Sequence, residues 1–100
     1  MNWDEYHGWS EKLAADAELA ARKGNRPLAE EMYRKAAQSE AEALDHVSLD
    51  RRRTRGITAV SAVALWYKGH ELAEAERLAH RYLGAADLPD FAQKIGRAHV

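Results

Sequence analysis

Glycine and proline stand at a few separated points in this 100-residue sequence, and their positions most constrain its fold. The first point is Gly24-Asn25-Arg26-Pro27. Glycine favours the carboxyl end of one helix, and proline suits the first turn of the next, where its missing N–H would have no partner. Gly69 marks a later break. Because Ala, Glu, Leu and Arg dominate between the breaks, the sequence predicts an all-α chain.

The first two helices are predicted from apolar residues at steps of three and four. Leu13, Ala17 and Ala20 define a helix that Ser10 is expected to cap. Residues 3–9 either extend this helix across Gly8 or form a short separate flanking segment, and the second arrangement is favoured. The second helix begins near Pro27 and carries two lines of small and apolar residues. These are Leu28, Met32, Ala36, Ser39, Ala43 and Val47, and Ala29, Tyr33, Ala37 and Leu44.

Residues 48–56 lose the helical period and concentrate arginine, which predicts a connection with Thr54 as the cap of the following helix. Residues 57–68 are apolar nearly all round, so this helix is expected to be the most buried. A fourth helix is predicted over residues 71–83. Pro89 predicts a short capping helix from about residue 88.

The two predicted hairpins, residues 10–48 and 56–84, are similar to each other, which is typical of repeat proteins. Ala17, Gly24, Ala29, Tyr33 and Ala36 match the tetratricopeptide pattern of small residues, turn glycine and aromatic. In the second hairpin, Ala62, Leu65 and Gly69 match the first helix of the pattern. Ala75, Ala79 and Tyr82 match its second helix only if one residue is inserted after Gly69. The chain resembles a tetratricopeptide-repeat protein, and this resemblance implies a right-handed stack of two antiparallel helical hairpins with short flanking helices.

The resemblance also implies where a partner binds, because such arrays usually hold peptides or proteins in the groove lined by the first helix of each hairpin. Counting from the matched alanines selects Ala14, Glu18 and Ala21 in the first hairpin, with Arg22 at the rim, and Val63 and Trp66 in the second. The candidate contacts are Glu18, Arg22, Val63 and Trp66, together with Lys68 at the end of the same predicted helix. Core burial of Trp66 is the alternative. Residues 53–57 and 65–68 also resemble a segment of short bacterial repeat proteins without an assigned activity, which adds no chemistry.

Charge and cysteine content exclude several function classes. Lys and Arg total 15 against 16 for Asp and Glu, giving a formal charge of −1 and no bulk attraction to nucleic acid or anionic membrane. The absence of cysteine excludes disulfides and thiolate metal sites. The amino terminus lacks the basic and apolar regions of a signal peptide, and the apolar stretch 57–67 is too short to span a bilayer. A cytoplasmic protein is predicted.

Three groups of polar residues are candidates for a functional site. His70 and Glu74 lie one turn apart, but the second histidine of a zinc-protease helix is missing and His80 lies on another turn. The run Arg51, Arg52, Arg53 and Arg55 has no phosphate-binding loop beside it. The serines Ser10, Ser39, Ser48 and Ser61 occur outside any nucleophile motif. No catalytic residue, metal site or cofactor is expected.

The sequence therefore predicts a non-enzymatic scaffold that binds a protein or peptide. The alternative is a self-assembling helical module, because about three stacked repeats are normally needed for stability. Residues 1–93 are expected to form one domain. Residues 94–100 are similar to the translation of a sequencing-library adapter and are predicted to be a non-native tail.

Overall fold

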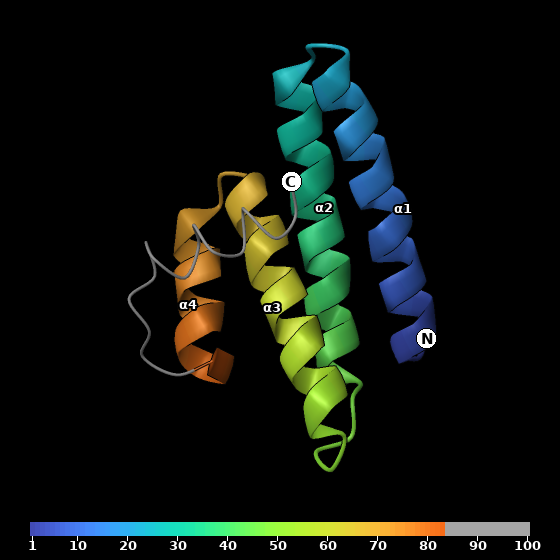
Figure 1. The fold of residues 1–100 in the computed structure, drawn as a ribbon, viewed down its shortest axis with the longest axis vertical. Helices are drawn as coiled ribbons and strands as arrows, with labels where there is room; N and C mark the ends of the chain where they lie inside the picture. Colours follow the sequence, from blue (N-terminus) through green and yellow to red (C-terminus); the bar gives the residue numbers. More distant parts are fainter. Residues whose placement is uncertain (84–100) are drawn as a thin grey trace.

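The computed structural model describes residues 1–83, and every regular element in this part is an α-helix. The helices are α1 (Trp3–Arg22), α2 (Arg26–Asp45), α3 (Arg52–Lys68) and α4 (Leu72–Leu83). Each helix packs mainly against the one before and after it, and the chain turns back at every connection (Figure 1). The all-α prediction is confirmed for these residues. The predicted capping helix and the predicted tail lie outside them.

Helix α1 starts earlier than expected, and Ser10 is not its cap. Asn2 and Glu5 form a capping box, in which Asn2 Oδ1 accepts from Glu5 N at 3.0 Å and Glu5 Oε1 accepts from Asn2 N at 3.3 Å. Such a cap is worth about 1 kcal/mol, which offsets the roughly 1 kcal/mol that Gly8 costs inside a helix. Residues 3–9 are therefore part of α1, and Ser10 is buried within it.

The predicted break at Gly24 is confirmed. Gly24 has φ +80°, a left-handed conformation that glycine adopts without strain. Asn25 caps α2, its side chain accepting a hydrogen bond from Leu28 N at 3.3 Å, and Pro27 lies in the first turn. Gly24 thus ends α1, and Asn25 and Pro27 begin α2 directly after it.

Helix α3 also begins before its predicted start. Arg51 is the N-cap residue and makes no side-chain cap hydrogen bond, so the prediction that Thr54 caps this helix is wrong. Thr54 lies in the first turn, where its carbonyl oxygen accepts from Thr58 Oγ1 at 2.7 Å. Arg52 and Arg53 are consequently helical and exposed, and Gly56 is accommodated inside the helix.

Alanine dominates the core. Fully buried alanines occur in all four described helices, and small side chains allow helix backbones to approach closely; they are Ala17, Ala36, Ala37, Ala43, Ala62 and Ala75. Leu65 joins Ala36 and Ala37 between α2 and α3, while Val63 and Ala64 join Ala75 and Ala79 between α3 and α4. Half-buried Tyr33 packs against the α2–α3 cluster.

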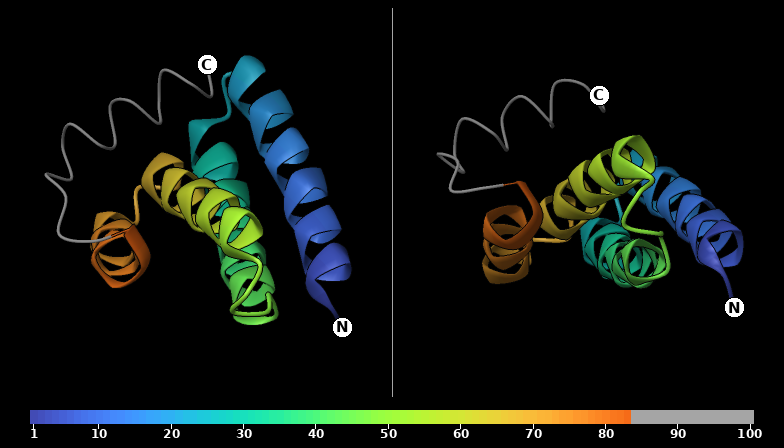
Figure 2. Two further views of the ribbon diagram at one scale, coloured as in Figure 1. Left: turned by 60° about the horizontal axis from the view of Figure 1, so that its bottom comes forward. Right: turned by 90° about the horizontal axis from the view of Figure 1, so that it is seen from below.

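Helices α1 and α3 both pack against α2, and α4 lies on the side of α3 away from α1 (Figure 2). The turn after α3 touches α2 closely at Gly69, where an added Cβ would lie 2.7 Å from Arg34 Cγ and 3.0 Å from Arg34 N. Arg34 Nη1 donates to Gly69 O at 2.9 Å. Within residues 1–83, no helix combines the length and apolar character needed to cross a bilayer.

Candidate functional site

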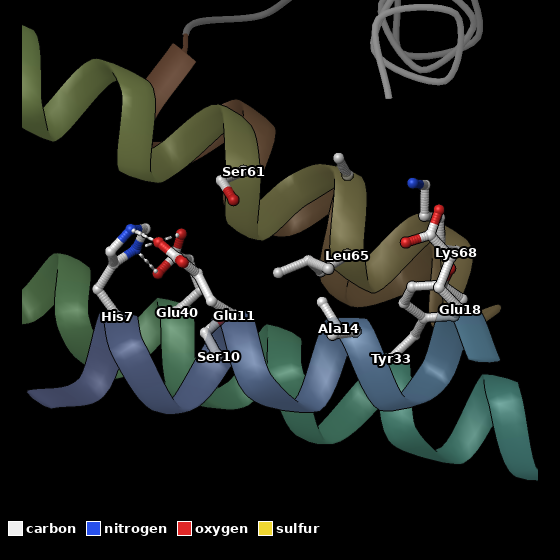
Figure 3. A pocket seen from close by; sticks show the side chains of 12 residues that line it. His7, Ser10, Glu11, Ala14, Glu18, Tyr33, Glu40, Ser61, Leu65 and Lys68 are labelled. Carbon is white, nitrogen blue, oxygen red and sulfur yellow. Dashed lines mark hydrogen bonds and ion pairs between the residues drawn. The ribbon is translucent and has the colours of Figure 1, made fainter. Parts of the chain in front are cut away.

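A groove runs between α1 and α3 with α2 as its floor. It encloses a cavity of about 350 Å³. Figure 3 shows His7, Glu11 and Glu40 together at one end, Ala14 and Leu65 in the middle, and Glu18 with Lys68 at the other end. We refer to this surface as the α1–α3 groove; its remaining lining residues are Ser10, Ala15, Tyr33, Ser61 and Ala64.

His7 is held between two carboxylates. Its Nδ1 lies 2.9 Å and 3.2 Å from the two oxygens of Glu40, and its Nε2 lies 2.6 Å from Glu11 Oε1. Carboxylates accept hydrogen bonds, so both ring nitrogens must carry protons for both contacts to form. Burial is the largest single influence and lowers the pKa of His7. The hydrogen bond and charge of Glu40, with those of Glu11, outweigh it and raise this pKa above 6.5.

Glu40 is the unusual member of this group, because its side chain is only 1% exposed. It lies on α2 among the buried residues Ala37, Ala43 and Leu44. A buried carboxylate is costly unless it is paired and hydrogen-bonded. The His7 imidazolium supplies that pairing and thereby joins the amino-terminal half of α1 to the carboxyl-terminal half of α2.

Trp3 connects this pair to α3. Its ring stacks on His7 with centroids 4.6 Å apart and planes 10° apart, and its Nε1 donates to Thr58 Oγ1 at 3.1 Å. Beyond this stack lies a second cavity of about 500 Å³, lined by Trp3, Ile57 and Val60 among others. His7, Glu40 and Ser61 line both cavities. The buried carboxylate therefore lies where two cavities meet.

The opposite end of the groove contains Lys68, Tyr33 and Glu18. Lys68 Nζ lies 5.6 Å from the centroid of the Tyr33 ring, which places a cation over an aromatic face. Burial lowers the pKa of Lys68, and the charge of Glu18 opposes this effect. Burial also raises the pKa of Tyr33, with a further contribution from Glu18. This end presents both signs of charge beside one aromatic ring.

The structure separates the predicted contact residues into two sets. Glu18 and Lys68 line the α1–α3 groove, and exposed Arg22 lies near it with its Nη2 3.8 Å from Glu18 Oε1. Val63 is 0% exposed and packs against α4, and half-buried Trp66 contacts both core clusters. Val63 and Trp66 thus lie at the core clusters, and neither lines the cavity of the α1–α3 groove.

The residues weighed as metal ligands lie apart. His70, which adopts φ +60° in the turn before α4, has its Nε2 3.7 Å from Glu30 Oε1. Glu74 is paired with Arg77, and His80 Nε2 lies 3.9 Å from Glu76 Oε1. In the described part of the chain, no three His, Asp or Glu side chains are placed to share a metal ion.

The arginine run and the serines serve varied local roles. Arg55 is half-buried, with its guanidinium carbon 5.6 Å from the Tyr82 ring centroid, while Arg51, Arg52 and Arg53 are exposed. Ser39 Oγ donates to Tyr6 O at 2.7 Å and fastens α1 to α2. Ser10 and Ser61 line the α1–α3 groove, and Ser48 is exposed in the connection before α3.

Sequence reasoning missed His7, Glu11 and Glu40. The sequence contained one signal of Glu40. Small and apolar residues recur at steps of three and four along one face of the second helix, at Ala29, Tyr33, Ala37 and Leu44, and the step between Ala37 and Leu44 falls on Glu40. A carboxylate on a core-facing line requires a buried partner. That partner could not be identified, because His7 lies 33 residues away.

Comparison of this chain with known proteins identified no relative. No protein-family model matches this chain, and no curated protein or solved structure is significantly similar to it.

Proposed function

We propose that this chain is a non-enzymatic scaffold that binds a peptide segment of a partner protein in the α1–α3 groove. In this proposal α1/α2 and α3/α4 are two hairpins stacked as in a tetratricopeptide array, with α1 and α3 as the groove-lining helices. The observation that carries the proposal is the groove itself: an open cavity with Ala14 and Leu65 between two charged ends.

This arrangement suits binding better than catalysis. Both ring nitrogens of His7 are engaged by carboxylates, so neither is available to accept a proton from a substrate. Ala14 and Leu65 offer apolar contact to a ligand side chain, and Glu18 and Lys68 offer hydrogen-bonding partners that would fix its register.

Peptide display against the immobilised chain tests this proposal. The charge-swapped variant Glu18→Lys/Lys68→Glu is expected to select different sequences or none, whereas Lys23→Glu should select the same sequences as the unchanged chain. Lys23 is an exposed cation that lines none of the described cavities. Identical selections by all three proteins would refute binding in this groove. Circular dichroism melting must first show that each variant remains folded.

Self-assembly is the second candidate, and a specific surface supports it. Met1 and Trp9 are 66% and 52% exposed, and they border a cavity of about 640 Å³ together with Tyr6 and Leu13. Large exposed apolar side chains gathered in one place mark interaction surfaces. Sedimentation velocity over a hundredfold concentration range tests this reading. An association that Trp9→Glu abolishes supports it, and a monomer at every concentration rules it out.

A further inference from the structure

The charge of the α1–α3 groove indicates which peptide it accepts. Among the described lining residues, the carboxylates Glu11, Glu18 and Glu40 face the cations His7 and Lys68. Two of the three carboxylates surround His7 at one end. That end therefore retains one negative charge even when His7 is protonated, and two when His7 is neutral.

Glu40 also has unused hydrogen-bonding capacity. In the described part of the chain its two oxygens share the single Nδ1–H of His7, at 2.9 Å and 3.2 Å. An ionised carboxylate accepts about four hydrogen bonds. Glu40 is 1% exposed, so this capacity faces the two cavities that it lines mainly as uncompensated negative charge.

Glu11 is held less firmly. Its side chain is 68% exposed and reaches His7 from the next turn of the same helix. An exposed ion pair at this spacing is worth only a few tenths of a kcal/mol. Glu11 can therefore exchange its histidine partner for another cation at little cost.

We infer that the His7 end of the groove binds a basic side chain, preferably arginine, of the peptide that the proposed function places there. The guanidinium takes Glu11 from His7 Nε2 and lies in the negative field of the buried Glu40. Arginine is preferred over lysine because its planar fork of N–H donors can bind the Glu11 carboxylate through two parallel hydrogen bonds. Neighbouring apolar peptide side chains lie over Ala14 and Leu65.

The inference implies competition between the ligand and a proton. The charged groups that face His7 are Glu11 from α1 and Glu40 from α2, while α3 contributes the uncharged Thr58 and Ser61 to the same cavities. A second cation at these carboxylates favours neutral His7. Peptide binding should therefore release a proton, and affinity should rise as the pH rises through the pKa of His7.

Randomised nonapeptides with a fixed central residue test this inference on the full chain. The central residue is arginine, lysine, glutamate or citrulline, the neutral isostere of arginine. Binding is followed by the NMR shifts of backbone amides in α1 and α3. Arginine peptides are expected to bind about tenfold tighter than citrulline peptides, the scale of one charge-assisted hydrogen bond. Their affinity is expected to increase between pH 5.5 and pH 8.

A matched pair of variants locates the effect. Glu11→Gln should remove most of the preference for arginine over citrulline, whereas Asp16→Asn, which neutralises an exposed carboxylate outside the described cavities, should preserve it. Equal binding of arginine and citrulline peptides, or equal losses in both variants, overturns the inference while leaving the groove proposal intact. If none of the peptides shifts amides of α1 or α3, the proposed function itself fails.

Discussion

At the scale of single residues, the pairing of His7 with Glu40 is the polar contact whose loss should destabilise the fold most. Glu40 is 1% exposed, and removing one partner of a buried ion pair leaves an uncompensated charge. The imidazolium also contacts Glu11 and stacks on Trp3, so one side chain links a carboxylate on each of two helices with an indole that reaches α3. The protonation state of His7 should therefore be visible in the stability of the whole chain.

Stability is expected to decrease as the pH rises above 6.5, the ordinary pKa of histidine. The pKa of His7 is raised above its ordinary 6.5 in the folded state, so the folded protein binds this proton more tightly than the unfolded protein does. The resulting stabilisation is complete below pH 6.5 and is lost as the pH rises through the folded-state pKa. Urea unfolding at half-unit pH intervals measures this dependence.

His7→Gln should flatten the pH dependence and cost about 1 to 3 kcal/mol at pH 6, because a buried acceptor loses its charged donor. His80→Gln is the matched control. His80 is an exposed histidine on α4 whose removal should preserve the wild-type slope. Parallel curves for the wild-type protein and His7→Gln would show that His7 is not responsible.

Two glycine substitutions should change stability in opposite directions. Gly69→Ala places a methyl group against Arg34, including its backbone nitrogen at 3.0 Å, and should destabilise the fold by about 1 to 3 kcal/mol. Gly8→Ala meets no atom within 4 Å inside α1 and should stabilise it by about 0.5 to 1 kcal/mol. Thermal melts of both variants provide the measurement. A neutral Gly69→Ala would mean that α2 and this turn separate easily.

At the scale of elements, helix ends were predicted correctly where a residue interrupts the helical hydrogen bonds. They were predicted wrongly where a glycine only weakly disfavours the helix and other interactions compensate for it. Gly24 and Pro27 bound α1 and α2 because a left-handed residue and a missing N–H both interrupt the helical hydrogen bonds. Gly8 and Gly56 lie inside helices because each costs only about 1 kcal/mol there. The capping box at Asn2, which compensates for Gly8, was present in the sequence but overlooked.

The residues that line the groove were only partly predictable, because sequence periodicity does not specify which neighbour each helix face contacts. The tetratricopeptide pattern placed Glu18 and Lys68 on helices that line it, yet the same counting selected Val63, which faces α4. Helix α3 is apolar on both sides, so its sequence does not distinguish the face toward α2 from the face toward α4. The His7–Glu40 contact depends on how α1 crosses α2, which local periodicity does not encode.

Overpacking at the helix contacts tests the predicted role of the core alanines. Ala29→Leu and Ala62→Leu should each destabilise the fold by about 1 to 3 kcal/mol, because both side chains are buried where helices approach closely. Ala73→Leu, at an exposed position of α4, is the control and should stay within about 0.5 kcal/mol. If the buried and exposed substitutions shift the melting temperature equally, close approach at these alanines is not what limits stability.

At the largest scale, the four helices of residues 1–83 form a linear series. Helix α2 packs against both α1 and α3, whereas α4 packs mainly against α3. When each element contacts mainly its neighbours, stability is approximately the sum of separate units and their interfaces. Local contacts of this kind also favour fast folding. The end of such a series can open while the rest stays folded.

Helix α4 is therefore expected to open before α2 does. Native-state hydrogen exchange should give smaller opening free energies for the backbone amides of α4 than for those of α2, because fewer buried side chains hold α4 in place. Ala17→Gly provides the decisive comparison, since it weakens α1 by about 1 kcal/mol at a buried position, and α1 packs mainly against α2. If α4 opens on its own, this substitution should lower the opening free energy of α2 and leave that of α4 unchanged. Equal reductions in both helices would show instead that α1 to α4 unfold as a single cooperative unit, in which case the groove and α4 could not move independently when a peptide binds.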